Sequence, residues 1–199
     1  MRHALPALLA LASAACASAP TADDVGAYPR LLTGTWTNRA QFAAAPDDMK
    51  HPPAGADDDW LDQVSVTFTP AAASTVPNAA LAEWRDGAGT LLGRGLWAFR
   101  RDGATIKLDL YELHNSSTLI ESKPVSKGPG CALAVTAAGG GAFNAQTDPD
   151  TCLSGGAHLD IRITAMPTGI LYQELKRGDD GAFVSRAPGG VPYDLRRTP

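Results

Sequence analysis

Residues 128–159 read GPGCALAVTAAGGGAFNAQTDPDTCLSGGAHL, and the rest of this sequence is interpreted outward from them. The run 131–135 alternates apolar and small residues, which is typical of a half-buried strand. The glycines at 139–141 then turn the chain, and a second run returns it toward Cys152. Two antiparallel strands of this kind would place the thiols of Cys131 and Cys152 within bridging distance. We therefore predict a Cys131–Cys152 disulfide, whose loop of about 20 residues stabilises the fold by roughly 3 kcal/mol.

The N-terminus, MRHALPALLALASAACASAP, has the pattern of a secretion leader. Arg2 supplies a positive charge, and the apolar run at 4–15 is too short to cross a bilayer as a permanent helix. Two processing routes are open, namely cleavage after the small residues 12–14 or cleavage before Cys16 with lipid attached to its thiol. We favour the lipid, because one disulfide among three cysteines leaves Cys16 over, and exported proteins rarely keep an idle thiol.

Length and composition predict a single exported domain. We assign 1–15 to the signal peptide, 16–27 to a flexible tether rich in small residues, and 28–199 to one folded domain. The formal net charge of −4 and the lack of a long Lys/Arg cluster argue against nucleic acid as a partner. An exported compartment is oxidising, which supports the disulfide. The only membrane contact we expect is the lipid anchor.

The folded part shows a period of two, which indicates strands. Asp and Gly clusters able to adopt positive φ separate the runs, as in tight hairpins. A short N-terminal helical turn is expected near 28–32, a helix at 38–45 with Asn38 and Gln41 as a capping box, and a loop at 46–59. A meander of eight or more strands most simply closes into an all-β, antiparallel, calycin-like or lipocalin-like barrel. The expected strands are 64–68, 79–86, 91–101, 105–113, 131–136, 142–147, 158–164 and 170–176.

The triplet Gly34-Thr35-Trp36 lies where a first strand should begin. It matches the Gly-x-Trp of lipocalin-like barrels, in which the Trp closes one end and stacks on an Arg. Arg186, Arg196 or Arg197 would supply that cation. The alternative interpretation, Trp36 as an ordinary core residue, also leaves it buried.

Several residues also resemble the T-type phycobiliprotein chromophore lyases, the CpcT/CpeT family. The two spaced cysteines in their strand context carry most of the resemblance, which extends weakly into the N-terminal half. The resemblance implies a ten-stranded, homodimeric barrel that binds an open-chain tetrapyrrole and attaches it to a phycobiliprotein cysteine. The residues concerned are Gly130-Cys131-Ala132, Phe143, Thr147, Cys152, Ser154, Gly156-Ala157, Leu31-Leu32-Thr33-Gly34, Gln41 and Glu83.

The candidate site residues are polar and aromatic positions within the strands. Glu83 falls at the family's acidic position, and Arg94 on the next strand is its expected partner if the carboxylate points inward. Glu83 would bind pyrrole nitrogens or handle a proton, and Arg94 would anchor a propionate. Trp97, Tyr111 and Trp36 are expected to line or cap the interior, although an aromatic residue in a strand is often plain core.

Three functions remain open at this point: a bilin lyase, a non-enzymatic exported carrier of a small hydrophobic molecule, and an envelope protein that contacts other proteins. The export leader argues against the lyase reaction, because phycobiliproteins are assembled in the cytoplasm. No hydrolase, phosphate-loop or zinc-protease motif is present. His51, His114 and His158 lack metal-type spacing, so we expect no metal. The only cofactor that the resemblance suggests is a bilin or another tetrapyrrole.

Overall fold

The computed structural model describes residues 24–50, 61–71, 74–113, 124–126, 128, 130–187 and 191–198. This part of the chain is mainly β-sheet, and every strand pairing in it is antiparallel. The strands are β1 (Gly34–Thr37), β2 (Val64–Pro70), β3 (Ala79–Asp86), β4 (Leu91–Asp102), β5 (Thr105–Leu113), β6 (Pro124–Ser126), β7 (Leu133–Ala138), β8 (Ala142–Gln146), β9 (Leu153–Ser154), β10 (Ala157–Met166), β11 (Gly169–Arg177), β12 (Phe183–Ala187) and β13 (Tyr193–Arg197).

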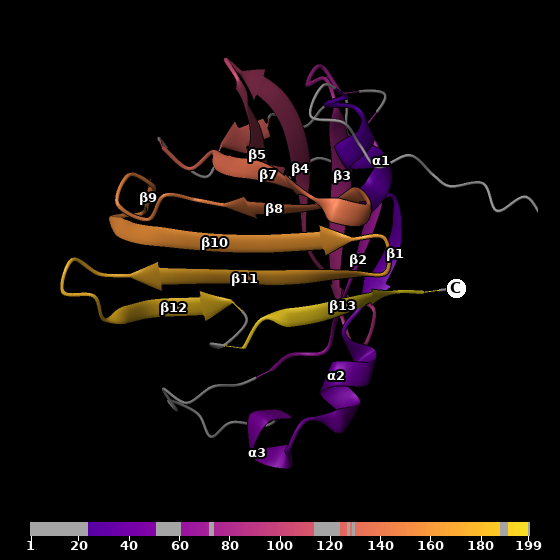
Figure 1. Ribbon diagram of the computed structural model, residues 1–199. Coiled ribbons are helices and arrows are strands. Elements are labelled where there is room, and N and C mark those ends of the chain that lie inside the picture. Colours follow the sequence, from indigo (N-terminus) through magenta and orange to yellow (C-terminus); the bar gives the residue numbers. More distant parts are fainter. Residues whose placement is uncertain are drawn as a thin grey trace, which may run out of the picture.

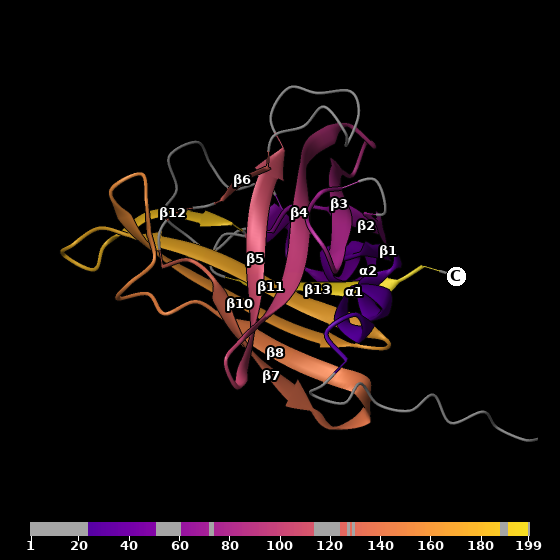
Figure 2. The same cartoon turned by 90° about the horizontal axis from the view of Figure 1, so that it is seen from above.

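Ten of these strands close into a barrel, as the sequence predicted. The order around the ring is β11-β13-β1-β2-β3-β4-β5-β7-β8-β10, and β10 pairs with β11 to complete it. The strands β6, β9 and β12 extend the edges of β5, β10 and β11. In Figures 1 and 2 the long strands β4 and β5 cross β10 and β11, so the barrel consists of two crossing layers.

The predicted strands agree with the observed ones to within a few residues, and two further strands near the C-terminus were not predicted. These are β12 and β13, which follow the Gly181 turn and the Pro-rich segment ending at Pro192. In the closed ring β13 pairs with both β11 and β1. The last strand of the chain therefore joins the N-terminal strand β1 to the C-terminal strand β11.

A short helix, α1 (Ala27–Leu32), closes one end of the barrel, where the sequence predicted a helical turn. It lies against β2, β3, β4 and β10. The ring of Tyr28 stacks on Phe99 with centroids 5.2 Å apart and meets the edge of Phe143 at 5.4 Å. Tyr28 and Leu32 are both fully buried, so side chains fill this end of the barrel.

Trp36 forms the floor at the closed end. It is fully buried, and its Nε1 donates a hydrogen bond of 2.6 Å to the carbonyl of Leu32. Arg197 lies over its ring, with the guanidinium carbon 4.2 Å from the ring centroid. The same guanidinium donates to the carbonyls of Thr33 at 2.7 Å and Leu31 at 3.0 Å. The Trp–Arg stack expected from Gly34-Thr35-Trp36 is present, and Arg197 is the cation.

The helix α2 (Arg39–Ala44) begins where the sequence predicted a helix, but the predicted capping box is wrong. Asn38 makes no side-chain capping bond, because its amide instead bridges to the chain entering β2, accepting from the Val64 N–H at 2.8 Å. The Gln41 side-chain amide donates to the carbonyl of Pro192, just before β13, and accepts from the N–H of Asp194 on β13. Figure 1 shows α2 at the end of the barrel opposite α1.

Two further findings concern the helices. The expected loop after Ala45 contains a short helix, α3 (Asp47–Lys50), while residues 51–59 of that loop lie outside the described part. No helix among the described residues combines the length and apolar character needed to cross a membrane.

The predicted disulfide between Cys131 and Cys152 is present, with the two Cα atoms 4.4 Å apart. Its position differs from the prediction, because both cysteines lie in turns before β7 and β9 rather than in paired strands. Cys131 N–H donates to the Gly128 carbonyl, and Cys152 N–H donates to the Asp148 carbonyl at 2.9 Å. The Leu159 N–H also donates to the Cys152 carbonyl at 2.9 Å, so pairing with β10 continues at Cys152, and the disulfide joins the two turns.

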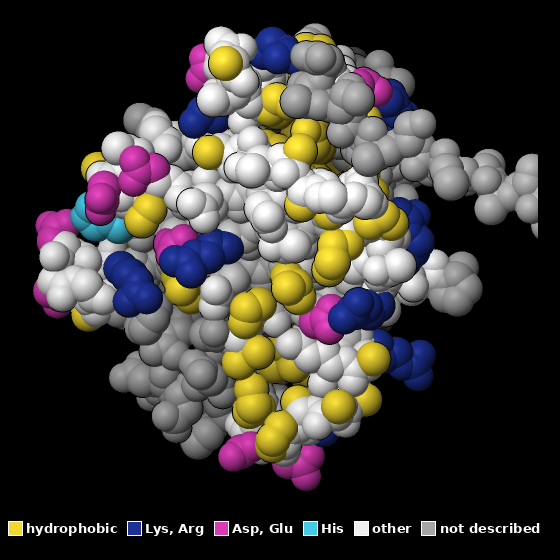
Figure 3. All heavy atoms as spheres, in the orientation of Figure 1, with side chains coloured by type: hydrophobic (Ala, Val, Ile, Leu, Met, Phe, Trp, Pro, Cys, Tyr) yellow, Lys and Arg dark blue, Asp and Glu magenta, His cyan; other side chains and the backbone are white. Residues whose placement is uncertain are grey.

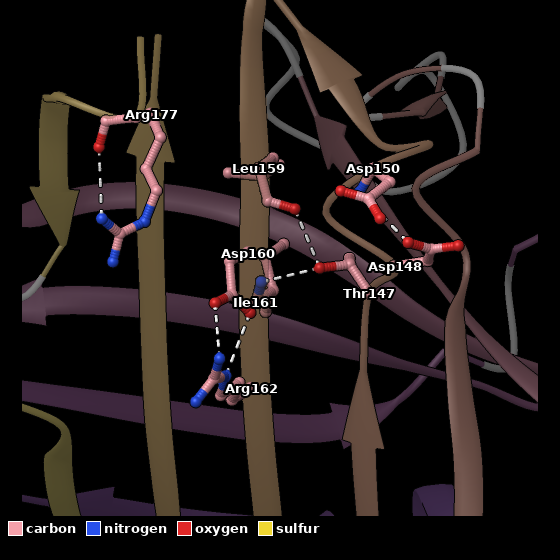
Figure 4. A network of polar contacts seen from close by, with 9 residues as sticks. Thr147, Asp148, Asp150, Leu159, Asp160, Ile161, Arg162 and Arg177 are labelled. Carbon is pink, nitrogen blue, oxygen red and sulfur yellow. Dashed lines mark hydrogen bonds and ion pairs between the residues drawn. The ribbon is translucent and has the colours of Figure 1, made fainter. Parts of the chain in front are cut away.

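A buried threonine holds the adjacent end of β8 against β10 (Figure 4). The hydroxyl of Thr147 accepts from the Ile161 N–H at 2.8 Å and donates to the Leu159 carbonyl at 2.9 Å. Its own N–H donates to the Ile161 carbonyl at 3.0 Å. These bonds continue the ladder past the last strand residue, Gln146, and so fix the start of the turn that carries Cys152.

The outer face of the front layer mixes ion pairs with apolar side chains (Figure 3). Arg162 pairs with Asp160 at 2.8 Å, and Arg196 pairs with Asp194 at 2.8 Å. Leu171 on β11 is 38% exposed on this face. Apolar side chains continue in Figure 3 toward α2 and α3 as a broken stripe.

We expect loss of the disulfide to destabilise the barrel. Replacing both Cys131 and Cys152 by Ala should lower the free energy of unfolding by about 3 kcal/mol, because the closed loop spans 21 residues. Urea denaturation of the oxidised, reduced and double-Ala proteins measures this effect. The control is reductant added to the double-Ala protein, which should change nothing, and equal stability of all three forms would contradict the expectation.

The Trp36–Arg197 contact should also be measurable in the stability. Arg197→Ala removes the cation over the indole and two hydrogen bonds, and should cost about 1–2 kcal/mol. The matched control is Arg30→Ala on α1, whose ion pair with Asp24 is exposed and should contribute less than about 0.5 kcal/mol. Equal effects of the two variants on urea unfolding would show that the stacked geometry contributes nothing.

Candidate functional site

A cavity of about 590 Å³ lies inside the barrel at the end opposite α1. This volume is in the range of pockets that bind small organic molecules, about 300–1,000 Å³. Two wall residues, Glu112 and Leu92, are exposed, Leu92 by 59%, so the cavity opens to solvent at this rim. The wall is formed by Val64, Trp84, Leu92, Gly93, Arg94, Gly95, Trp97, Leu110, Tyr111, Glu112, Leu113, Tyr172 and Tyr193.

The space exists because Gly93 on β4 lies opposite a large aromatic side chain on β3. Ala82 on β3 is fully buried in the core, and strand alternation puts Trp84 on the same inner face. Trp84 pairs with Gly93 on β4, and Ala82 pairs with Gly95. A Cβ added at Gly93 would meet no atom within 4 Å. The missing side chain at Gly93 therefore leaves open volume beside the Trp84 indole.

Four aromatic side chains from four strands form the inner part of the wall. The ring centroid of Tyr172 lies 5.2 Å from that of Trp84 and 6.0 Å from that of Trp97. Tyr193 lies 6.4 Å from Trp84, and Trp97 rests edge-on against Phe68 at 4.9 Å. Such contacts hold the rings in fixed orientations and present aromatic faces to a ligand. Trp97 also separates the cavity from the filled core below it.

Carboxylates accompany these rings. Glu112 alternates with the buried core residues Leu108 and Leu110, so its side chain belongs to the inner face of β5. On β11 the hydroxyl of Tyr172 donates a hydrogen bond of 2.6 Å to Glu174. The polar side chains of the cavity wall are therefore Glu112, the tyrosines and Arg94.

Burial controls the protonation of the two cavity tyrosines. Loss of hydration raises the pKa of Tyr172 well above its usual value, and the charge of Glu174 and its hydrogen bond raise it further. Burial likewise raises the pKa of Tyr193, and the nearby Asp62 carboxylate adds to this. Both phenols stay neutral at physiological pH and keep their donor protons.

Glu83 and Arg94 form the predicted ion pair, at 2.8 Å, but not inside the cavity. Glu83 lies between the inward Ala82 and Trp84, which places its carboxylate on the outer face of β3, and it is absent from the cavity wall. Arg94 contributes to the wall, while its guanidinium contacts Glu83. The expectation that Glu83 binds a ligand does not fit this geometry, because the inner face of β3 is the one carrying Trp84.

The aromatic candidates separate into three places. Trp97 is 5% exposed and lines the cavity, as expected. Tyr111 borders the cavity, but it packs against an outer cluster containing Leu96 and Ala98. Trp36 is buried in the floor at the closed end and is not part of the wall.

Sequence reasoning missed Trp84, Glu112, Tyr172 and Tyr193. Trp84 follows Glu83 directly, so choosing the other face of β3 would have found it. Glu112 shares its face with Leu108 and Leu110, a signal that was present in the sequence. The two tyrosines meet only because β13 pairs with β11, which no local pattern reveals.

The ionisable side chains of the described wall are Glu112, Arg94 and three tyrosines. This wall contains no cysteine, histidine, serine or lysine. Among the described residues no three His, Cys, Asp or Glu side chains gather as metal ligands. Cys16, His51 and His114 lie outside the described residues.

A spectrophotometric titration tests the burial of the tyrosines. The protein has four tyrosines, and burial raises the pKa of each, including Tyr28 and Tyr111. Absorbance at 295 nm should show little phenolate in the native protein at about pH 10, where the urea-unfolded chain is half ionised. Since the unfolded state releases protons that the folded state retains, stability should be complete below about pH 10 and fall as pH rises further.

The variant Tyr172→Phe should flatten this alkaline loss of stability, because Tyr172, whose pKa burial raises well above its usual value, no longer ionises on unfolding. Native and unfolded titration curves that coincide would show that the four phenols are solvated in the folded protein.

Comparison with known proteins supports the fold. No family model matches the chain, and no curated protein matches it. Among solved structures, the T-type phycobiliprotein lyase CpeT from Prochlorococcus phage P-HM1 is similar, with a TM-score of 0.56 and 11% sequence identity over 88% of this chain and 98% of that chain. At this identity the likeness concerns the fold, so this chain has the barrel architecture of a T-type lyase.

Proposed function

We propose that this protein is a carrier that binds one small, mostly apolar molecule with a planar ring system in the open end of its barrel. The supporting observation is the cavity of about 590 Å³ at one end of the barrel core, with Trp84, Trp97, Tyr172 and Tyr193 in its wall. Rings held at several angles favour a flat conjugated ligand that stacks on one and meets the edges of others. Tetrapyrroles belong to this class, and the fold of CpeT makes them the first ligands to test.

A lyase activity that attaches a bilin to a protein cysteine is the second candidate, supported by the likeness to CpeT. The residues of the wall favour binding without a covalent step, since Glu112 and the phenols are its only groups able to exchange protons. Colour that remains on a phycobiliprotein apo-subunit after denaturation, following incubation with this protein and a bilin, would identify the lyase.

The location of the protein is part of the same proposal. The leader pattern at 1–15 supports export, and Cys16 is the proposed lipid attachment site, with 16–27 as a tether. An exported protein would meet its ligand in the envelope, where a carrier keeps an apolar molecule in solution. The proposal includes a homodimer, which the family resemblance implies.

Ligand titration with a cavity-filling variant tests the carrier. Biliverdin and haem, added to the purified protein, should quench the fluorescence of Trp84 and Trp97 and saturate at one equivalent. Gly93→Leu should weaken binding at least tenfold while leaving the fold intact, because the new side chain enters open space. Failure of both ligands to quench, or equal affinity of Gly93→Leu, would contradict a tetrapyrrole in this cavity.

The matched control is Gly139→Leu, which adds the same side chain in open space at the turn between β7 and β8, away from the cavity wall. Its affinity should equal that of the unmodified protein. Urea unfolding of both variants checks that neither change in binding results from loss of structure.

A further inference from the structure

The three tyrosines of the cavity wall differ in what their hydroxyls do. The Tyr172 hydroxyl donates a hydrogen bond of 2.6 Å to Glu174, so its proton is already engaged within the protein. Tyr111 packs against the outer cluster that contains Leu96, which makes it a border residue of the cavity. Tyr193 is therefore the inner tyrosine whose donor remains to be accounted for.

Tyr193 is held in a defined place in the wall. It shares the inner face of β13 with Leu195, which is fully buried, and it is itself only 7% exposed. Its ring centroid lies 6.4 Å from that of Trp84, and in the sheet it pairs with Tyr172. The side-chain amide of Gln41 hydrogen-bonds the backbone on both sides of it. The strand and its neighbours therefore fix where this side chain enters the cavity wall.

The hydroxyl of Tyr193 has no hydrogen-bond partner among the described residues. Within the same residues, the side-chain atom that is both inaccessible and unpaired is Oδ1 of Asp194, so the Tyr193 oxygen keeps accessible surface. Because Tyr193 lines the cavity and is otherwise covered, that surface faces the cavity. Burial raises the pKa of this phenol, and the charge of Asp62 adds to the rise, so the hydroxyl keeps its proton. It is a neutral donor without an acceptor.

An indole of the wall presents a second donor of this kind. The N–H of Trp97 can only donate, and like the Tyr193 hydroxyl it has no partner among the described residues and is not inaccessible. At the closed end, by contrast, the N–H of Trp36 donates to a backbone carbonyl at 2.6 Å. The charged wall residues Glu112 and Arg94 both interact with other groups of the protein. The unengaged polar groups of the inner wall are therefore neutral donors.

Building on the proposed function, we propose that the cavity selects planar ligands that carry a hydrogen-bond acceptor oxygen, such as a ring carbonyl, and that the Tyr193 hydroxyl donates to this oxygen. A bare hydrocarbon placed against the hydroxyl would take it out of water without replacing the hydrogen bond, whereas an acceptor oxygen replaces it. Tyr193 is thus a residue that determines specificity. Tetrapyrroles carry such oxygens, as ring carbonyls or as propionates, so they meet this requirement.

Pyrene and 1-pyrenecarboxaldehyde test the inference, because they share one ring system and differ by a carbonyl group. Binding is followed by quenching of tryptophan fluorescence. Tyr193→Phe removes only the hydroxyl, and should weaken binding of the aldehyde about five- to tenfold while binding of pyrene stays the same or tightens. The matched control, Tyr28→Phe, makes the same change in the filled end of the barrel and should leave both affinities unchanged. Urea unfolding of both variants checks their folds.

The outcomes separate the donor from the carrier. Undiminished affinity of Tyr193→Phe for the aldehyde, or equal losses for the aldehyde and pyrene, would overturn the role of Tyr193 and leave the carrier function intact. Failure of the unmodified protein to bind either compound would overturn the carrier and this inference together.

The infrared carbonyl stretch of the bound aldehyde gives a readout that a purely structural role of Tyr193 would not move. In the unmodified protein and in Tyr28→Phe the stretch should lie below its position in acetonitrile, a polar solvent without a strong donor, because a hydrogen bond weakens the C=O bond. In Tyr193→Phe it should return to that position. A stretch in the unmodified protein that is not lowered would overturn the inference, even if Tyr193→Phe failed to fold.

Discussion

The pairing of β11 with β13 is the interaction on which the rest of the structure depends. The ten strands form a ring only if β11 pairs with β13, which in turn pairs with β1. The β11–β13 pairing consists of four residue pairs, from Gly169–Arg196 to Tyr172–Tyr193. Beyond Tyr172 the same edge of β11 pairs with β12 instead. The ring is thus complete only near the closed end and stops at the two tyrosines that line the cavity. The strand pairing that closes the barrel therefore also brings together Tyr172 and Tyr193 of the aromatic wall.

The two ends of the barrel differ because of side-chain volume. Toward α1 the inward positions carry Phe68, Phe99, Phe143 and Trp36, which pack to near-zero exposure around Tyr28. Toward the other end the inward positions of β4 are Gly95 and Gly93, opposite the alanine and tryptophan of β3. Close packing excludes voids wherever side chains can fill them. Gly93 therefore leaves the barrel open beside Trp84, whereas at Gly95 the Tyr111 carbonyl would lie 2.6 Å from an added Cβ and leaves no such space.

The sequence predicted the strands, the closed barrel and the disulfide, because each depends on a local pattern or on chemistry that few residues share. It did not predict which face of β3 points inward. Both faces of β3 carry apolar residues, because Leu81 packs in an outer cluster with Leu96. Strand alternation therefore puts Glu83 and Trp84 on opposite faces but does not say which of the two faces points into the barrel. Only the closed ring, with Val66 of β2 beside Trp84, settles the choice. The site residues that were missed follow from this single ambiguity and from the late strand β13.

Asn38 shows the same limit at one residue. Its type and its spacing to Gln41 fit a helix cap, and the helix does start there. In the folded chain, however, the Val64 N–H would be buried without a partner if the Asn38 side chain did not accept its hydrogen bond at 2.8 Å. An unpaired buried donor costs about 1–3 kcal/mol, more than a cap contributes on average, so the long-range bond is made in preference to the local one. That choice ties α2 to the start of β2, and Gln41 ties the same helix to Asp194 on β13. One short helix thereby bridges the entry of β2 and the closing strand β13, and it holds the backbone on both sides of Tyr193 in the cavity wall.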